Sequence, residues 1–457
     1  MTHQMEADLF TVERFTLDNG LRVWCKPRPG TGTVALLLQV RVGTRYETKA
    51  NNGISHFLEH MVFTGSERWT EEEIKESIRR RGGSWNGTAD YEDTTYEVHL
   101  RAADLAFGLD WLAEVVFRPT LPPEIVDRER SVIIEEKGGR LSRWLVWLDD
   151  LGFGYDLGRA VRRGMFPGSA LGLYVIGEDS SLAHIGRKEL LAHHRRYYLP
   201  NNMTLIVVGD VPPQAVQREV QTSFGGFAPG PLPPRPATPP QVGRPLRIRL
   251  RGPEITDRAG LLMGGRTGGL SDPDRFAQEV LAEVLEHALI EDLRYRQALV
   301  YDITAEIVAY TDVGLFTIAT TCDGGSLNRV RLSINRYIRR ICEGELSEAA
   351  LAEARAALRG RALLGLESNL ELAWWLASEA LHERPDAPVP NYFAELDRVT
   401  RDDVIRAART VFRAETRFEA VHRPFITVAR GVRLLAASLG LAAATLALRR
   451  HVGLRSY

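Results

Sequence analysis

The chain has 457 residues, 44% of them hydrophobic, and a formal net charge of −1. This length and apolar content suffice for two or three domains with substantial cores, and the near-zero net charge argues against a nucleic-acid partner. Three scattered cysteines (Cys25, Cys322 and Cys342) exclude a disulfide framework and a cysteine zinc site, and they fit a reducing compartment. The N-terminus, MTHQMEADLF, has the features of neither a signal peptide nor a transit peptide.

The first elements are a hairpin, a buried strand and a helix. Asp18-Asn19-Gly20 is a turn between two alternating apolar runs, which predicts a β-hairpin, and VALLLQVRV (34–42) predicts a buried strand. The stretch NNGISHFLEHMVFTGS (51–66) has apolar residues at helical spacing. TEEEIKESIRRRGG (70–83) predicts a second helix, which Thr70 can cap and the glycine pair can end.

The rest of the first half alternates strands and helices. SWNGTADYEDTTYEVHLR (84–101) predicts a pair of strands, and a helix is expected over 105–116. PEIVDRERSVIIEEKGGRLSRWL (123–145) predicts one long helix, and NMTLIVVGDV (202–211) predicts a strand that ends in a turn.

A proline-rich stretch divides the chain nearly in half. Residues 225–245 read GGFAPGPLPPRPATPPQVGRP, which favours an extended interdomain linker. The segments 182–198 and 396–412 align at an offset of 214, and each leads into a strand-like run. We therefore predict an α+β fold with two duplicated α/β-sandwich domains, mostly antiparallel sheets packed by helices, over 1–224 and 246–427.

The C-terminal tail, 428–457, has its own character. Leu434–Leu448 holds fifteen uncharged and mostly apolar residues between arginines, which favours an apolar C-terminal helix. Such a helix would span about 22 Å, short of the roughly 30 Å of a bilayer core. A terminal core helix of the second domain is one reading. A short membrane anchor is preferred, because the run is apolar on all faces and follows the last repeat-matched strand.

Two histidines in HFLEH (56–60) carry the strongest chemical signal. On a helix, His56 and His60 lie one turn apart on one face, where both imidazoles can bind one divalent ion. Glu59 lies beside them and can accept a proton from a metal-activated water. The order His-x-x-Glu-His is the inverse of the commoner zinc-protease helix. The alternative is an amphipathic helix with a polar edge.

A catalytic zinc needs a third protein ligand, and the helix over 123–145 offers four glutamates. They are Glu124, Glu129, Glu135 and Glu136. Glu129 and Glu136 are seven residues apart and share a helix face, whereas Glu135 points about 100° away. One metal ligand and one carboxylate that orients a histidine would use that spacing.

The chain resembles the M16 (pitrilysin) metallopeptidases over roughly residues 10–425. LDNGLRV, GISHFLEHMVFTGS, GGSWNGTADYEDTTY, RERSVIIEE and YYLPNNMTLIVVGDV occur in the order typical of that family. The closest resemblance is to the half-length branch that includes mitochondrial processing peptidase and its bacterial relatives. In that branch the glutamate ligand follows the second histidine by 76 residues, and here that position is Glu136.

The resemblance implies roles for particular residues. It implies one Zn²⁺ per chain, with His56, His60 and Glu136 as ligands. It implies Glu59 as the general base and Glu129 as a carboxylate that supports the ligands. It also implies three substrate-binding residues, with Arg294 and Tyr301 facing the metal site from across a chamber and Asn86 holding the substrate backbone. The second half does not repeat the histidine pair. Its nearest match is EVLEH (283–287), which has a glutamate at the position of the first histidine, so we expect His287 to be structural.

The implied function is a zinc-dependent endopeptidase that hydrolyses peptides or unfolded protein segments. Family members with four such domains in one chain imply that this two-domain chain pairs, first as a homodimer and second as a heterodimer with a metal-less sister chain. The alternatives are a non-catalytic scaffold subunit and a membrane-tethered binding module. We expect cytoplasmic catalytic domains, possible membrane association through the tail, and no nucleic-acid partner.

Overall fold

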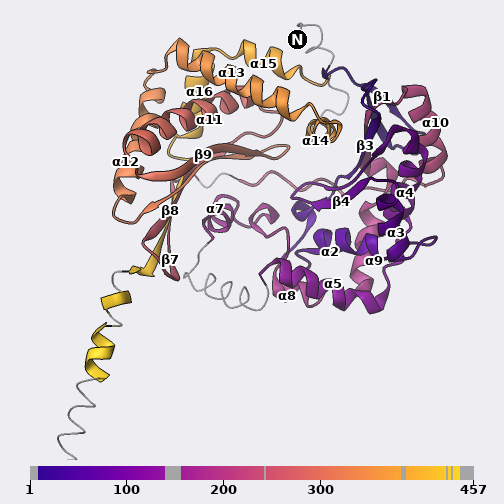
Figure 1. Ribbon diagram of the computed structural model, residues 1–457, viewed down its shortest axis with the longest axis horizontal. Coiled ribbons are helices and arrows are strands. Elements are labelled where there is room, and N and C mark those ends of the chain that lie inside the picture. Colours follow the sequence, from indigo (N-terminus) through magenta and orange to yellow (C-terminus); the bar gives the residue numbers. More distant parts are fainter. Residues whose placement is uncertain are drawn as a thin grey trace, which may run out of the picture.

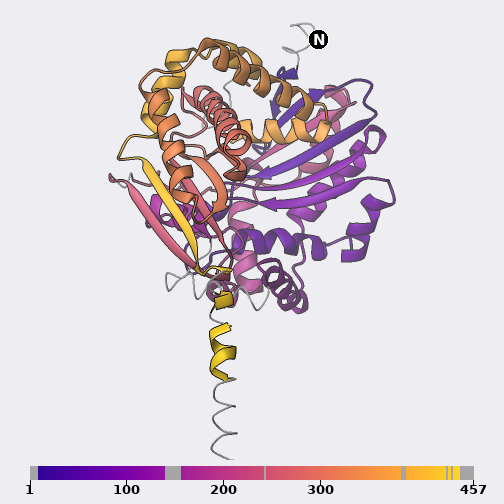
Figure 2. The ribbon, with the colours of Figure 1, turned by 60° about the vertical axis from the view of Figure 1, so that its left-hand side comes forward.

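The computed structural model places two sheet-and-helix halves side by side, with the short helical segments 431–433 and 436–442 projecting from the second half (Figures 1 and 2). The structure describes residues 9–138, 156–240, 243–381, 388–428, 431–433 and 436–442.

The first half is built on a six-stranded sheet in the order β1-β2-β6-β3-β5-β4. Only the β2–β6 pair is parallel, and the other neighbours are antiparallel. The predicted hairpin is the β1–β2 pair, in which Glu13 faces Cys25. The strands are β1 (Glu13–Thr16), β2 (Arg22–Pro27), β3 (Thr33–Val40), β4 (Ser84–Ala89), β5 (Thr94–Arg101) and β6 (Met203–Gly209).

Helices pack on one face of this sheet and enclose the first core with it. They are α2 (Ile54–Met61), α3 (Glu71–Arg79), α4 (Leu105–Phe117), α5 (Pro123–Glu136), α9 (Arg187–Tyr197) and α10 (Pro213–Phe224). The predicted cap of α3 is present as a full capping box, in which Thr70 accepts from the Glu73 N–H and Glu73 accepts from the Thr70 N–H. Short helical turns complete this half: η1 (Thr44–Tyr46), η2 (Val62–Thr64), η3 (Ala102–Asp104), η4 (Ala170–Gly172), α8 (Asp179–Leu182) and η5 (Pro200–Asn202).

The second half repeats this plan with a five-stranded sheet in the order β7-β11-β8-β10-β9. Strands β2, β6, β3, β5 and β4 correspond to these in turn, and the β7–β11 pair is again the parallel one. Helices α9 and α16 (Arg401–Val411) begin and end 214 residues apart, as the aligned segments predicted. The strands are β7 (Leu246–Ile255), β8 (Arg258–Thr267), β9 (Val300–Ala309), β10 (Gly314–Asp323) and β11 (Arg417–Ile426).

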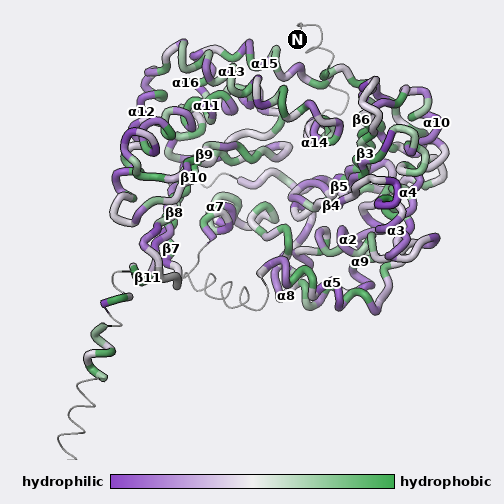
Figure 3. The backbone as a smooth tube through the Cα atoms, viewed as in Figure 1, coloured by the Kyte–Doolittle hydropathy of each residue, from purple (hydrophilic) through white to green (hydrophobic). Residues whose placement is uncertain are grey.

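The helices of the second half pack mainly on one side of its sheet (Figure 1), and hydrophobic and hydrophilic residues alternate along them (Figure 3). Besides α16 they are α11 (Arg275–Leu289), the π-helical turn η6 (Ile290–Arg296), α12 (Leu327–Cys342), α13 (Glu348–Gly365) and α15 (Tyr392–Arg398). The domain limits 1–224 and 246–427 stay a prediction.

One helix from each half packs on the sheet of the other half. Helix α14 (Asn369–Ala380), from the second half, packs on β3 and β6 of the first sheet through a core that includes Leu372 and Leu376. Helix α7 (Leu157–Met165), from the first half, packs on β7, β8 and β11. Figure 1 shows α14 beside β3 and α7 below β9. This exchange covers part of the second face of each sheet and joins the two halves.

The proline-rich stretch 225–245 forms neither helix nor strand where it is described, and charged contacts hold it in place. Arg235 lies 3.2 Å from a Glu92 carboxylate oxygen of the first half and 3.4 Å from one of Asp312 of the second. Arg45 bridges the same two carboxylates, with an Nη2–Oδ2 distance of 2.6 Å to Asp312. The linker is therefore extended, as predicted, and fastened to both halves.

Helix α5 ends earlier than the single long helix predicted over 123–145. Its last residue is Glu136, and Gly138 follows with a φ of +104°, a left-handed conformation that glycine adopts without steric cost and that ends many helices. Residues 139–145 lie outside the described residues.

The predicted apolar C-terminal helix, Leu434–Leu448, is not supported. Of that run only 436–442 are described, and they form a short helical segment, whereas 434–435 and 443–448 lie outside the described residues. Within the described part of the chain, every helix is too short or too polar to cross a membrane.

Candidate metal centre

Helix α2 presents the two histidines toward α5. Its N-terminus is held by the buried Glu47 carboxylate, which accepts hydrogen bonds from the Gly53 N–H at 2.8 Å and the Ser55 N–H at 2.9 Å. Because α2 buries its apolar face in the core, the opposite face carries His56 and His60, with ring centroids 4.7 Å apart. The donor atoms of these two residues and Glu59 lie within 4.8 Å of one another.

The carboxylate of Glu136, at the end of α5, meets both imidazoles. Its Oε2 lies 3.7 Å from His56 Nε2 and 3.4 Å from His60 Nε2. Ligands about 2.1 Å from a tetrahedral zinc ion stand about 3.4 Å apart. Glu136 Oε2 thus stands from each histidine nitrogen at about the distance that separates two zinc ligands, and two imidazoles with a carboxylate are a donor set that fits the implied metal.

Glu129 stands behind His60. Its Oε2 lies 3.5 Å from His60 Nδ1, the ring nitrogen that does not face Glu136. Its Oε1 accepts from Arg128 Nε at 3.0 Å, which fixes the carboxylate. A carboxylate on the far nitrogen orients a metal-binding histidine and raises its basicity. The other two candidate carboxylates, Glu124 and Glu135, are exposed and make no contact with the histidines among the described residues.

Burial sets the protonation of the site. Desolvation, with the nearby His60, lowers the pKa of His56 to about 4, so the ring is neutral near pH 7 and can donate a lone pair. Desolvation, with the nearby Glu136 charge, raises the pKa of Glu59 to about 8. A cation held by the histidines would oppose that rise, because opposite charge favours the carboxylate.

Glu59 lies against the edge strand β4. A Cβ on Gly87 would stand 2.2 Å from Glu59 Oε1, so only glycine leaves room for this carboxylate. The exposed Asn86 precedes Gly87, and β4 pairs only with β5 within the described sheet. The free edge of β4 therefore runs past Glu59. Gly87 is a site residue that sequence reasoning missed, and the Asn-Gly pair inside a strand was the signal that could have revealed it.

Arg294 and Tyr301 lie together in the second half, away from this cluster. The Arg294 guanidinium stands 5.2 Å from the centroid of the Tyr301 ring, which is 75% exposed. Among the described residues, no hydrogen bond or ion pair joins either one to the His56 cluster. The structure thus pairs these two predicted residues, with Tyr301 exposed and Arg294 partly buried.

The second half has an ion pair where the first half has the histidines. In EVLEH (283–287), Glu283 of α11 occupies the position that the first histidine has in HFLEH. Its carboxylate pairs with Arg361 of α13 at 2.7 Å. Glu286 accepts from the Ala305 N–H of β9 at 2.7 Å, and His287 is exposed. Among the described residues, Glu283, Glu286 and His287 form no cluster of metal-binding side chains.

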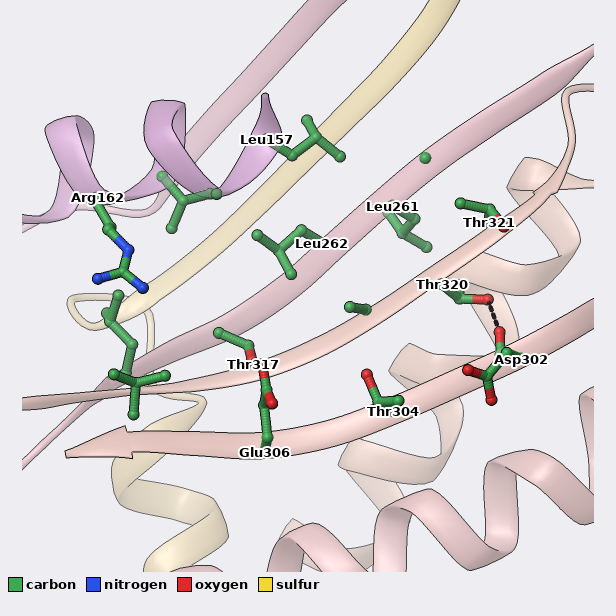
Figure 4. Close-up of a pocket in the computed structure, with 16 residues that line it drawn as sticks. Leu157, Arg162, Leu261, Leu262, Asp302, Thr304, Glu306, Thr317, Thr320 and Thr321 are labelled. Atoms are coloured by element: carbon green, nitrogen blue, oxygen red, sulfur yellow. Dashed lines mark hydrogen bonds between the residues drawn. The ribbon is translucent and has the colours of Figure 1, made fainter. Parts of the chain in front are cut away.

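A separate cavity of about 470 Å³ lies between α7 and the sheet face of β8, β9 and β10 (Figure 4). Asp302, Thr304 and Glu306 of β9 point into it, and Arg162 of α7 stands at one end. None of the histidines and glutamates described above lines this cavity. Its chemistry is that of a polar wall beside an edge strand, not of a metal centre.

Comparison with known proteins gives a consistent relationship. The family model for insulinase (peptidase family M16) matches residues 22–145, and that for the peptidase M16 inactive domain matches 184–358. An uncharacterized zinc protease of Streptomyces coelicolor is 26% identical over 89% of this chain and 88% of its own length. The mouse mitochondrial-processing peptidase subunit beta is 24% identical over 85% of this chain and 80% of its own length.

Solved structures share the fold. A crystal structure of a protease from Helicobacter pylori superposes with a TM-score of 0.80 and 21% identity, covering 91% of this chain and 99% of that one. The two family models together cover most of the chain, in the order of its two halves, and the relatives are matched over most of their own length. The chain therefore belongs to the half-length branch of the M16 peptidase family.

Proposed function

We propose that the protein is a zinc-dependent endopeptidase that cleaves peptides or unfolded protein segments. The observation that carries the proposal is that Glu136 Oε2 lies 3.7 Å from His56 Nε2 and 3.4 Å from His60 Nε2, with Glu59 beside the two histidines. The names of the relatives, zinc protease and processing peptidase, support the same reaction class.

The three ligands would hold one zinc ion and leave a position for water. When bound, zinc makes a water more acidic and polarises the carbonyl of the scissile bond. Glu59 accepts the proton of the attacking water and delivers it to the leaving amine. Glu129 keeps His60 in the orientation in which Nε2 faces the ion.

The substrate would lie extended along β4. An edge strand offers unpaired N–H and C=O groups to an incoming strand, and β4 carries the exposed Asn86 next to Gly87 and Glu59. A peptide added there passes beside the general base. This placement favours unfolded segments over folded proteins, because only an extended chain can pair with a strand edge.

The working particle would be a homodimer. The chain carries the ligand set in its first half and the Arg294–Tyr301 pair, with an exposed Tyr301 ring, in its second. In this arrangement the Arg294 and Tyr301 of one chain face the zinc site of its partner and stabilise the developing oxyanion. A heterodimer with a metal-less sister chain is the second arrangement.

The expected location is cytoplasmic, with membrane association through residues 428–457 as a further proposal. Its support is the apolar composition of Leu434–Leu448. Detergent-free fractionation tests it: the full chain should sediment with membranes, and a chain ending at Val428 should stay in the supernatant. Equal distribution of the two chains would reject the anchor.

The test of the reaction joins metal content with cleavage of a quenched, unstructured peptide. The wild type should carry about one zinc per chain and cleave the peptide, and a chelator should abolish cleavage. Glu59→Gln should keep the zinc and lose at least about 100-fold in kcat, because general acid–base catalysis contributes about that much or more.

Glu135→Gln is the matched control, since Glu135 is exposed on α5 beside Glu136 and should leave both readouts unchanged. Full cleavage by Glu59→Gln would reject the mechanism. Stable zinc binding with no cleavage by the wild type would favour the non-catalytic scaffold subunit, and absence of zinc would favour a binding module.

A further inference from the structure

A basic hollow of about 330 Å³ lies between β7, β11 and α12. All of its lining residues belong to the second half, whereas the candidate metal centre belongs to the first. Four arginines line it: Arg249 and Arg251 of β7, Arg331 of α12 and Arg423 of β11. Glu419 is the one carboxylate among its lining residues in the described part of the chain. Four guanidinium groups against one carboxylate leave a strong excess of positive charge.

The strand register places like charges next to each other. In the parallel β7–β11 pair, Arg251 lies opposite Arg423, and Arg249 lies opposite Val421. Like charges on directly neighbouring strands repel and destabilise the pair. The described residues provide no salt bridge to Arg249, Arg251 or Arg423 that would relieve the repulsion.

Arg331 adds an unsatisfied donor to the hollow. Its Nη1 lies 3.2 Å from Glu419, but its Nε is buried and finds no hydrogen-bond partner among the described residues. A buried donor without a partner costs free energy comparable to a lost hydrogen bond. An acceptor in the hollow would satisfy it.

We propose that this hollow binds a phosphate-type anion, held by Arg249, Arg251, Arg331 and Arg423. The guanidinium fork matches the spacing of two phosphate oxygens, so arginine forms bidentate bonds with this group. One tetrahedral anion would separate the charges of Arg251 and Arg423 and accept from Arg331 Nε. The site is independent of the proposed peptidase reaction.

Two sources share this chemistry, namely a soluble phosphate compound and the phosphodiester of an anionic lipid. Strand β11 ends at Ile426, and its partner residue in the β7 register is Ile255, just beyond Arg251. The apolar run of the tail begins a few residues later in the sequence. Arg251 and Arg423 thus lie near the end of the β7–β11 pair, from which the chain continues toward the described segment 431–433.

The first measurement is isothermal titration of the full-length protein with inorganic phosphate, at an ionic strength fixed with sodium chloride. The wild type should bind phosphate, and Arg251→Gln and Arg423→Gln should each weaken binding at least about fivefold. Arg331→Lys keeps the charge but removes Nε, and it should also weaken binding. Arg218→Gln is the control, because Arg218 is an exposed arginine of α10 paired with its neighbour Glu219.

The second measurement is flotation with vesicles of phosphatidylglycerol or phosphatidylcholine. A drop in phosphatidylglycerol binding for Arg251→Gln relative to Arg218→Gln identifies the lipid headgroup as the source. Weaker phosphate binding with unchanged flotation identifies a soluble phosphate compound. The proposal is overturned if the wild type binds phosphate no better than chloride and its flotation equals that of the variants, or if Arg218→Gln weakens binding as much as Arg251→Gln does.

Discussion

Glu59 owes its place to the absence of a side chain on the neighbouring strand. A Cβ added at Gly87 would lie 2.2 Å from Glu59 Oε1 and 2.9 Å from its carboxyl carbon. The carboxylate is the free end of a flexible side chain, so it can swing away while the strand stays in place. The substitution therefore separates the position of the base from the stability of the fold.

Gly87→Ala should lower kcat at least about tenfold, because general acid–base catalysis depends on hydrogen-bond reach between the base and its proton. Zinc content and melting temperature should stay close to those of the wild type. Gly226→Ala is the control, since a Cβ there meets nothing within 4 Å. Unchanged kcat in Gly87→Ala, measured with the quenched peptide, would show that Glu59 tolerates the displacement.

A second residue-scale effect concerns Glu279 in α11. Burial raises the pKa of its carboxyl to about 7 from an ordinary 4.5, although the Tyr392 hydroxyl donates to it at 2.9 Å. The folded state therefore holds this proton more tightly than the unfolded chain does. The contribution of this protonated carboxyl to the free energy of unfolding is fully present below pH 4.5, and it is lost as the pH rises through 7.

Glu279→Gln should remove the loss of stability that accompanies ionisation of Glu279 at high pH. The variant and the wild type should have similar stability near pH 5, and the variant should be more stable near pH 8 by up to a few kcal/mol, because one pKa unit is worth about 1.4 kcal/mol. Thermal melts at the two pH values measure the difference. Glu415→Gln, at an exposed position, should follow the wild type. A constant offset at both pH values would contradict the assignment.

At the scale of elements, the exchange of α7 and α14 ties the two halves together. Leu376 of α14 is fully buried in the core that α14 forms with β3 and β6. Leu→Ala in such a core costs about 2–5 kcal/mol, including the cavity left behind. The cost falls on the contact between the halves and not on either half alone.

Leu376→Ala should therefore lower the melting temperature and split the unfolding of the two halves in scanning calorimetry. Leu364→Ala, at a position of α13 that is 76% exposed, should stay within about 0.5 kcal/mol of the wild type. Identical calorimetric traces for the two variants would show that α14 does not couple the halves.

At the scale of the whole molecule, mixing variants of Glu59 and Arg294 distinguishes action of Arg294 within one chain from its action across a dimer. Glu59→Gln and Arg294→Gln should each be nearly inactive alone. If the pair serves the partner's zinc, each mixed dimer has one complete site, and random exchange restores about a quarter of wild-type activity. A mixture no more active than its components would place Arg294 with the zinc of its own chain or outside catalysis, and sedimentation of the mixture checks that dimers form.

Much of the fold followed from local patterns. The hairpin at Asp18-Asn19-Gly20, the cap at Thr70 and the repeat offset of 214 are carried by neighbouring residues, and the structure has all three. The long helix predicted over 123–145 was wrong in its end, because the prediction passed over the local stop signal of Gly138-Gly139; Gly138 takes a φ of +104° and α5 ends at Glu136. The predicted apolar helix of the tail was not supported.

The sequence by itself determined the two-fold repeat, the helix that carries His56 and His60, and the family resemblance that points to Glu136. From the residues alone, the shared helix face favoured Glu129 and Glu136 among the four glutamates of one helix and left open which of the two binds the metal. Only the tertiary structure placed Glu136 against both imidazoles, Glu129 behind His60, and Gly87 against Glu59. The spacing of residues in a sequence predicts which side chains share a helix face. The distance between side chains on two helices depends on the whole core packed between them, and local spacing does not give it.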